Sequence, residues 1–490
     1  MRTRTARVAL APALVVLLSL GAAACGSQLQ PGQVAAVGHG VADPGNPGAV
    51  AAPVAGQPGA TAAAVPGAGD PVAPDAPGGV DPGAPGGPSG TGPSGGPGQQ
   101  PGEVSGESGP KPGSCAGFQN GDGITADTIR IGNVSDISGP VPGLFQQTQD
   151  AVRAYVAYFN ATSSICGRKL ELVSYDSRTD ASADQQAYTK ACDEVFATVG
   201  SASAFDSGGA ATADACGLPD IRTNSLTTDR NACGSCFGVN STNSQQFENI
   251  VPDTIRDRFG GGQHAAMLYI NAGAAAENGK TQAEIGRRRG LTYVYEVGID
   301  IAEFNYAPYV QEMKDRGVET IQFIANDALF ARLLHAMEQQ NFHPKVMMLD
   351  PSAYTDGYIE QAGDAAEGTI VFTNFTPFEE ASGNPELQLY EAWLNQVNPS
   401  AEPAFFGIFA WSAARLFTET AIRLGGDLDR ASLVAAMKKV DNWTGNGLHA
   451  PQRVGPKQVA GCWRFLRLHG GRWEPYLGAD YHCAGVTTLG

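Results

Sequence analysis

The residues with the clearest capacity for chemistry are the cysteines, of which this chain of 490 residues has nine. Two of them form Cys233-Gly-Ser-Cys236, a spacing that can support thiol–disulfide exchange. A reactive thiolate needs a stabilising helix N-terminus after a strand, whereas this motif lies in a stretch rich in glycine, asparagine and serine. A zinc site would need a second pair of ligands at suitable spacing, and the sequence offers none. We expect a local structural disulfide, no metal and no cofactor.

The histidines and serines give no catalytic pattern. The seven histidines are scattered and form no H-E-x-x-H motif. No G-x-S-x-G stands between a predicted strand and a predicted helix, where a hydrolase nucleophile would sit. Gly260-Gly261-Gly262 precedes a strand, so it is a loop and not a phosphate cradle. The sequence does not exclude a catalytic pair of carboxylates, because an acidic chain has many such side chains. We expect no enzyme, and a secreted hydrolase is the least favoured alternative.

The first 25 residues indicate export. Three arginines precede an apolar run over residues 8–20, and small residues then lead to Cys25, as in a secretory signal. The cysteine at the cut site resembles the lipobox of bacterial lipoproteins, although Ala22 stands where that motif more often has leucine. A retained span would be at the lower limit of bilayer-crossing length. We expect lipidation of Cys25 and a chain anchored to the outer face of the bacterial cell membrane.

The other eight cysteines suit disulfides in an oxidising compartment. The sequence alone does not decide which of these cysteines pair with each other. Cys192 ends a predicted helix and Cys216 lies just before a predicted strand, so these two neighbouring elements are a plausible pair to bridge. Cys462 with Cys483 could close the C-terminal tail.

Composition divides the chain further. Residues 26–113 consist largely of proline, glycine and alanine, which cannot bury enough apolar surface to fold, so we expect a disordered tether. The remainder is long enough for two domains. A formal net charge of −17 would repel nucleic acid and anionic lipid heads, which excludes both as partners.

The folded part alternates strands and helices. Regular alternation of this kind predicts parallel sheets with helices on both faces, that is, doubly wound α/β lobes. The pattern starts near residue 128 and restarts near residue 264. Strands are predicted at 129–136, 170–177, 195–201, 219–225, 264–271, 293–297, 320–327 and 344–351. Helices are predicted at 148–161, 187–197, 210–215, 280–289, 306–317, 329–340, 386–397, 405–424 and 430–440.

The order of these segments resembles the type I periplasmic-binding-protein fold, specifically the substrate-binding lipoproteins of branched-chain amino acid (leucine-binding-protein-like) ABC transporters. The matching stretches are IRIGNVSDISGPVPG, GRKLELVSYDSRTDASADQQAYTKACDEVFATVG, SASAFDSGGAATADACGLPDIRTNS and FFGIFAWSAARLFTETAIRLGG. The resemblance implies two lobes, joined by three hinge crossings, that close on a small ligand. It implies an N-lobe of residues 114–240 and about 374–442, and a C-lobe of about 241–373 and 443–490.

Residues carried over by position give candidate ligand contacts. The N-lobe candidates follow strands one, three and four: Ser138, Phe145, Asp206, Ser207, Asn224, Ser225 and Thr227. The C-lobe candidates follow later strands: Asn326, Asp327, Asp350 and Tyr354. The family's aromatic residue after the first C-lobe strand is missing, since Asn271-Ala-Gly-Ala-Ala-Ala stands there. An amino acid, an amide or another small polar ligand therefore stays open.

The resemblance implies a monomeric solute-binding protein that hands its ligand to an ABC permease in the membrane. A ligand sensor of the same fold, without transport, is the alternative. Both depend on lobe closure, so the membrane partner alone distinguishes them.

Overall fold

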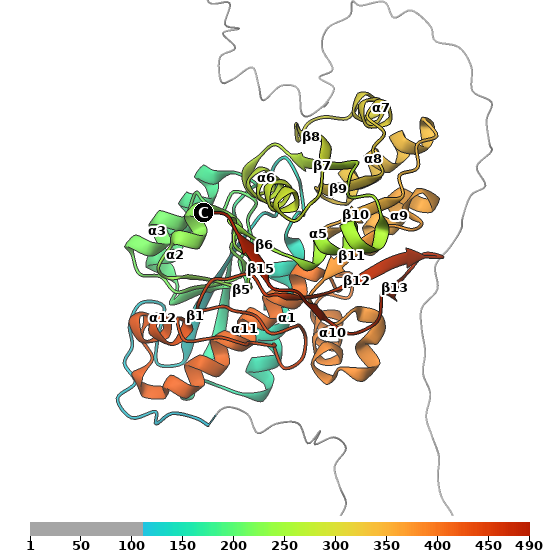
Figure 1. The fold of residues 1–490 in the computed structure, drawn as a ribbon. Helices are drawn as coiled ribbons and strands as arrows, with labels where there is room; N and C mark the ends of the chain where they lie inside the picture. Colours follow the sequence, from blue (N-terminus) through green and yellow to red (C-terminus); the bar gives the residue numbers. More distant parts are fainter. Residues whose placement is uncertain (1–110) are drawn as a thin grey trace, which may run out of the picture. The chain divides into compact units, whose positions relative to one another are not determined.

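The computed structural model describes residues 111–490, so Cys25, the predicted signal segment and residues 26–110 of the predicted tether lie outside the described residues. Residues 111–490 form two α/β lobes, each built around its own mostly parallel sheet, and this confirms the predicted fold class (Figure 1). Among these residues, no helix combines the length and apolar character needed to cross a membrane.

The first lobe contains a five-stranded parallel sheet in the order β2-β1-β3-β4-β5. Its strands are β1 (Thr128–Ser135), β2 (Lys169–Asp176), β3 (Ala197–Val199), β4 (Asp220–Asn224) and β5 (Cys236–Asn240). Successive side chains of a strand point to opposite faces. In β1, Ile129 and Ile131 therefore join one hydrophobic cluster, whereas Val134 joins another on the opposite face.

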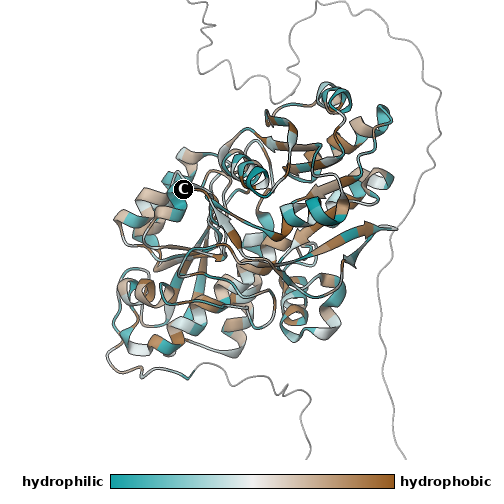
Figure 2. Cartoon of the chain, in the orientation of Figure 1, coloured by the Kyte–Doolittle hydropathy of each residue, from teal (hydrophilic) through white to brown (hydrophobic). Residues whose placement is uncertain are grey.

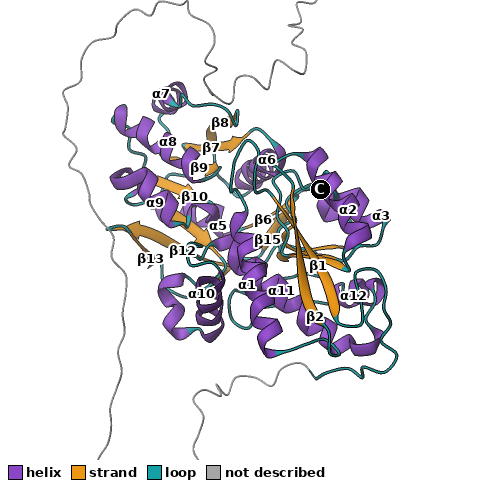
Figure 3. Cartoon of the chain, turned by 180° about the vertical axis from the view of Figure 1, so that it is seen from behind, coloured by secondary structure: helices purple, strands orange, loops and turns teal. Residues whose placement is uncertain are grey.

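Helices cover both faces of this sheet, as a doubly wound fold requires. One face packs against α1 (Gln146–Thr162) and α11 (Phe405–Leu424), and α10 (Pro385–Val397) packs on α1. The other face packs against α2 (Ala181–Glu194) and α3 (Ala210–Ala215). Two short helices, α4 (Thr228–Ala232) and α12 (Arg430–Met437), complete the lobe, and Figure 3 shows the helices around β1 and β2 from behind.

The second lobe contains the order β13-β12-β11-β10-β9-β7-β8, in which β12 and β13 are antiparallel and the other neighbours are parallel. Its strands are β7 (Ala265–Ile270), β8 (Tyr293–Ile299), β9 (Thr320–Ile324), β10 (Val346–Leu349), β11 (Ile370–Thr373), β12 (Cys462–His469) and β13 (Arg472–Tyr476), with β14 (His482–Cys483) paired to β12. The antiparallel additions come from the C-terminal segment.

Helices also cover both faces of the second sheet. They are α5 (Ile250–Thr254) with a π-helical turn (Ile255–Phe259), α6 (Gly273–Arg288), α7 (Ala307–Asp315), α8 (Asp327–Gln339) and α9 (Asp356–Ala362), with short 3₁₀ turns at Pro351–Ala353 and Gly363–Ala366. Two further 3₁₀ turns adjoin helices of the first lobe: Phe378–Gly383 precedes α10, and Gly425–Asp427 follows α11. Figure 2 shows hydrophobic residues concentrated on the strands, while α6 and α7 turn hydrophilic residues outward. This contrast fits helices that bury one stripe against a sheet.

Three chain segments cross between the sheets and contact one another. The Ser241 amide donates to Gln452 Oε1 at 2.9 Å, and Asn374 Nδ2 donates to Asn240 Oδ1 at 3.1 Å. In the first crossing, β6 (Gln246–Glu248) pairs antiparallel with β15 (Val486–Thr488), so the C-terminal strand reinforces the connection. These contacts make a hydrogen-bonded hinge.

The described residues contain four disulfide bonds. They are Cys115–Cys166, Cys192–Cys216, Cys233–Cys236 and Cys462–Cys483. The first ties the segment before β1 to the loop before β2. The CxxC pair joins the end of α4 to the first residue of β5, at the C-terminal end of a helix, where no helix dipole favours a thiolate.

Candidate binding site between the lobes

A cavity of about 930 Å³ lies between the two lobes. It is lined by segments that follow the carboxyl ends of β1, β4, β7, β9 and β10, by the hinge strand β6, and by the start of α11. In open α/β sheets, the carboxyl ends of the strands are where ligands bind. Its size is that of cavities that enclose small organic molecules.

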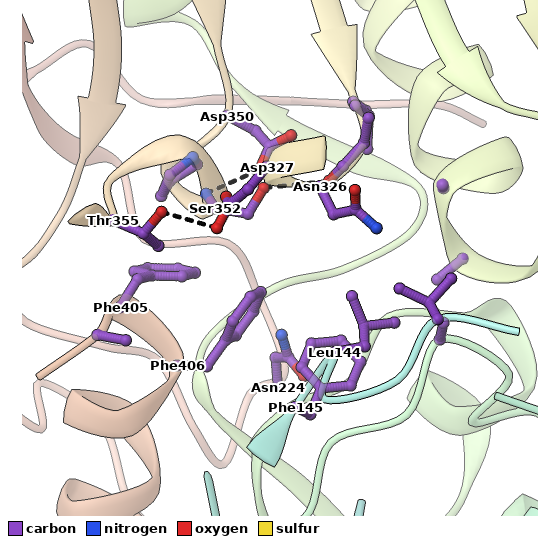
Figure 4. Close-up of a pocket in the computed structure, with 18 of the residues that line it drawn as sticks. Leu144, Phe145, Asn224, Asn326, Asp327, Asp350, Ser352, Thr355, Phe405 and Phe406 are labelled. Carbon is purple, nitrogen blue, oxygen red and sulfur yellow. Dashed lines mark hydrogen bonds between the residues drawn. The ribbon is translucent and has the colours of Figure 1, made fainter. Parts of the chain in front are cut away.

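Aromatic rings form one wall of the cavity (Figure 4). Phe145 precedes α1, and Phe405 and Phe406 begin α11. The ring of Phe406 packs edge-on against Phe145, with centroids 4.9 Å apart, and against Phe405 at 4.8 Å. Since α1 packs against α11, all three rings belong to the first lobe. Sequence reasoning assigned residues 405–424 to a long helix and did not single out Phe405 or Phe406.

Polar side chains form the opposite wall, in the second lobe (Figure 4). Asn326 is the N-cap of α8, and its side chain accepts from the Leu329 amide at 3.2 Å. Asp327 follows it and accepts from Thr355 Oγ1 at 2.8 Å. Asp350 caps the turn after β10 by accepting from the Ser352 amide at 2.9 Å. The short strand-to-helix turns thus carry these groups to the edge of the sheet.

Both aspartates on this wall hold their protons more strongly than usual. Burial raises the pKa of Asp327. Burial, with a smaller contribution from the charge of Asp327, raises the pKa of Asp350 to about 6. Asp350 Oδ2 is buried, and within residues 111–490 it has no hydrogen-bond partner. The wall therefore presents one carboxyl oxygen, Asp350 Oδ2, that lacks a donor among the described residues.

A third buried carboxyl group lies at the hinge. Glu248 ends β6, lines the cavity and is only 3% exposed. Its Oε1 atom has no partner among the described residues. Burial raises the pKa of Glu248 to about 8.

The donors at the strand ends of the first lobe are engaged inside the protein. Asp136, which follows β1, accepts from the Ala204 amide at 2.8 Å and from the Thr179 amide at 2.9 Å. Asp206, which follows β3, accepts from the amides of Leu226 and Thr227 at 2.8 and 3.2 Å. These buried carboxylates occupy four backbone amides at the carboxyl edge of the first sheet.

The structure brings five predicted ligand contacts together on the cavity walls: Phe145, Asn224, Asn326, Asp327 and Asp350. The other six do not line it. These are Ser138, Asp206, Ser207, Ser225, Thr227 and Tyr354. Their positions after strands match the prediction, but their surroundings in the structure give them other contacts.

Four of these six side chains make hydrogen bonds within the protein. Ser138 donates to Asp176, and Thr227 Oγ1 donates to Asp206 Oδ1 at 2.6 Å. Asp206 also lies 3.6 Å from the buried guanidinium of Arg222. The Tyr354 hydroxyl donates to the carboxylate of Glu379.

The remaining two serines act through their backbone. The Ser207 carbonyl accepts from the amide of Ala210 at the start of α3, and the Ser225 carbonyl accepts from Thr242 Oγ1 at 2.8 Å. Both contacts fix loops beside the cavity, so any effect on a ligand would be indirect.

Within residues 111–490, no three His, Cys, Asp or Glu side chains are grouped so as to hold a metal ion. A serine–histidine pair exists elsewhere, with Ser412 Oγ 2.8 Å from His449 Nε2. Both residues are buried away from the cavity, and burial lowers the pKa of His449 to about 4. The cavity is suited to binding.

Comparison with known proteins agrees with this geometry. No curated protein sequence matches the chain. A fatty acid ABC transporter substrate-binding protein from Thermomonospora curvata superposes with a TM-score of 0.65 at 17% identity, covering 75% of this chain and 95% of that one. The branched-chain amino acid transporter substrate-binding protein LivJ from Streptococcus pneumoniae, in complex with isoleucine, gives 0.61 at 15%, covering 73% and 100%. An R. palustris solute-binding protein in complex with 4-hydroxybenzoate gives 0.59 at 16%, covering 74% and 97%.

At these identities the solved structures show a shared fold. The sequence profile described as "Periplasmic binding protein" matches residues 128–472, well over half of the chain and nearly all of both lobes. The chain belongs to the periplasmic binding protein family.

Proposed function

We propose that this chain is an extracytoplasmic solute-binding protein that closes its lobes on a small organic ligand and delivers it to an ABC permease. The observation that carries the proposal is the cavity of about 930 Å³ at the carboxyl ends of both sheets, in a chain of this family. Its residues come from both lobes and from the hinge, so a ligand there would hold the lobes together.

Contacts across the cleft support a closing motion. The Ala274 amide, at the start of α6, donates to the Ala204 carbonyl at 2.8 Å, and Asn278 Nδ2 donates to the Leu226 carbonyl at 3.0 Å. Each bond joins the second lobe to the first. A ligand that touches both walls adds to these contacts and shifts the population toward the arrangement with the lobes together.

The ligand is proposed to be an amino acid or a related small organic compound. The solved relatives include proteins whose ligands are given as isoleucine and 4-hydroxybenzoate, and one described as serving fatty acid transport. Ligands of this size suit a cavity lined by apolar rings with a few polar groups. Lipidation of Cys25, a tether through about residue 113 and action as a monomer complete the proposal.

A thermal-shift screen of the full chain tests the function. Amino acids, their amides, amines and small carboxylic acids are added one by one, and the melting temperature is measured. A ligand that binds only the folded state at one hundred times its Kd adds about 2.7 kcal/mol of stability. A saturable shift with one chemical class, and unchanged ligand recovered afterwards, is expected. Absence of any shift, or turnover of a bound compound, would overturn the proposal.

A further inference from the structure

The first lobe offers few donors to a ligand carboxylate. Four amides at its strand ends, those of Thr179, Ala204, Leu226 and Thr227, donate to the buried carboxylates of Asp136 and Asp206. A carboxylate ligand would compete with these two groups for the same amides and would add a third negative charge beside them. Both effects disfavour an acid at this place.

The hydroxyl groups that line the cavity are engaged in the same way. Thr242 Oγ1 donates to the Ser225 carbonyl, Ser352 Oγ to the Ala325 carbonyl, and Thr355 Oγ1 to Asp327. Ser400 Oγ donates to Asn398 Oδ1 at 2.8 Å. Among the lining residues described, Thr179 supplies the one hydroxyl without a partner. The hydroxyl groups of the lining therefore leave little donor capacity for an anion.

Three buried side-chain oxygens of the lining are acceptors without a donor in the described part of the chain. Asn224 Oδ1, Glu248 Oε1 and Asp350 Oδ2 are buried, and none has a hydrogen-bond partner within residues 111–490. Asn224 and Glu248 are 1% and 3% exposed. A buried acceptor without a donor destabilises the empty protein, so a ligand that brings N–H groups supplies the missing hydrogen bonds and binds more tightly.

The lining residues include more acidic than basic side chains. The acidic side chains are Asp150, Glu248, Asp327, Asp350 and Glu402. Asp150 is paired with Arg153 at 2.8 Å, and burial raises the pKa of Glu248 to about 8, so Glu248 contributes an acceptor more than a charge. Among the described lining residues, Arg332 is the single basic side chain, and its guanidinium donates to the Glu303 carbonyl at 3.3 Å. Asp327 and Asp350 raise each other's cost of ionisation, and a cation beside them reduces their mutual repulsion and their desolvation cost.

Aromatic rings face these carboxyl groups across the cavity. Phe145, Phe405 and Phe406 lie on one side, and Asp327 and Asp350 lie on the other (Figure 4). Ring faces attract organic cations through their quadrupole and bury apolar carbon at the same time. Rings and carboxylates together therefore match a molecule with an apolar body and a positive head.

We propose that the cavity takes a small organic ammonium ion without a carboxylate, whose apolar part packs on Phe145, Phe405 and Phe406 while its N–H groups face Asp327 and Asp350. This assignment rests on the proposed solute-binding function and narrows its ligand class. It separates this chain from the relatives described with isoleucine or 4-hydroxybenzoate, since both of those ligands carry a carboxylate.

Four probes that share one phenylethyl body test the assignment. They are 2-phenylethylamine, 3-phenylpropanoate, 3-phenylpropanamide and phenylalanine, titrated into the full chain by calorimetry at pH 7.5. We expect the amine to bind about tenfold or more tightly than the other three, because it alone brings a positive charge without a negative one. Tighter binding of phenylpropanoate or phenylalanine, or no binding of the amine, would overturn the assignment. If the broader screen still finds a ligand, the solute-binding function survives that failure.

A matched pair of variants tests the role of the carboxyl group. Asp350→Asn keeps the side-chain shape and the cap on the Ser352 amide but removes the charge. Asp429→Asn is the control, because Asp429 caps α12, which lies away from the cavity. We expect Asp350→Asn to weaken amine binding about tenfold or more with little change for the amide probe, and Asp429→Asn to change neither. Equal amine affinity in Asp350→Asn and the unchanged protein would refute the assignment, provided that both melt at similar temperatures.

Discussion

Replacement of Glu248 by glutamine should change how stability depends on pH. Glu248 is 3% exposed, and no cation among the described residues pairs with it. Burial disfavours its charged form and raises its pKa from 4.5 to about 8. The folded protein therefore retains a proton on this group at a pH where the unfolded chain has released it.

The sign of the effect follows from proton linkage. Between about pH 4.5 and pH 8, the folded state binds more protons at Glu248 than the unfolded state, so the free energy of unfolding falls as pH rises. Each pKa unit corresponds to about 1.4 kcal/mol, so the full difference is roughly 5 kcal/mol as an upper limit. A neutral glutamine at this position cannot lose a proton, and it removes that part of the pH dependence.

Urea unfolding at pH 5, 6, 7 and 8 measures the effect. The difference in unfolding free energy between Glu248→Gln and the unchanged protein should move in favour of the variant as pH rises, by several kcal/mol over the range. Glu474→Gln serves as the control, because Glu474 lies exposed on β13. Parallel pH profiles for Glu248→Gln and the unchanged protein would show that Glu248 is ionised in the folded state and would refute the reasoning.

Three further variants test the cavity and its supports. Thr227→Ala removes the N-cap of α4 and the bond to Asp206, so it should lower the free energy of unfolding in urea by about 1 kcal/mol or more. It should also weaken ligand binding more than any change in the tether, and unchanged affinity would show that this loop does not support the site. Phe406→Ala should weaken binding about tenfold in calorimetry, whereas the matched change at Phe304, which is 82% exposed and outside the cavity, should have no effect; equal losses would refute the aromatic wall. Gly273→Ala places a Cβ atom 2.3 Å from the Ala204 carbonyl oxygen, at a residue with φ +47°, and should therefore keep the lobes apart. With ligand present, small-angle X-ray scattering should give the variant a larger radius of gyration than the unchanged protein, and identical profiles would contradict this.

Much of the fold could be predicted because long amphipathic segments carry clear periodicity. The helix predicted at 405–424 has those bounds in the structure, and the predicted strand at 264–271 differs from β7 by one residue at each end. The helix predicted near 280–289 begins earlier, at Gly273, because alanine and glycine there carry no hydrophobic pattern. Short buried strands such as β5 and β11 were not identified, since four or five residues are too few to show a period.

The candidate site was predictable in position but not in detail. Polar residues after parallel strands lie near the cleft whatever their partners, and this rule indicates the region around Asn224 and Asp350, which line the cavity. The sequence does not show which polar atoms are already bonded. Asp206 and Ser138 follow the same rule, yet their side chains are hydrogen-bonded within the first lobe. That distinction depends on distances between loops far apart in sequence.

The missing aromatic residue after β7 has a structural explanation. The resemblance to amino-acid binders implies a ring near residue 272, where this chain has Ala272-Gly273-Ala274. The start of α6 here approaches the Ala204 carbonyl closely enough for a backbone hydrogen bond, and a Cβ atom on Gly273 would already clash with that carbonyl. A large side chain at this contact would hold the lobes apart. Small residues here allow the two lobes to close, so aromatic contacts to a ligand must come from another part of the cavity.

In the proposed binding mode, the rings come instead from the first lobe, at the starts of α1 and α11, and this placement implies an order of binding. Phe145, Phe405 and Phe406 contact one another without help from the second lobe. An apolar ligand body can therefore dock on them while the lobes are apart. In the proposed binding mode, Asp327 and Asp350 reach the ligand head only on closure, so the ligand binds the closed arrangement more tightly than the open one. Accordingly, loss of a ring should weaken the first encounter, whereas loss of the Asp350 charge should weaken closure.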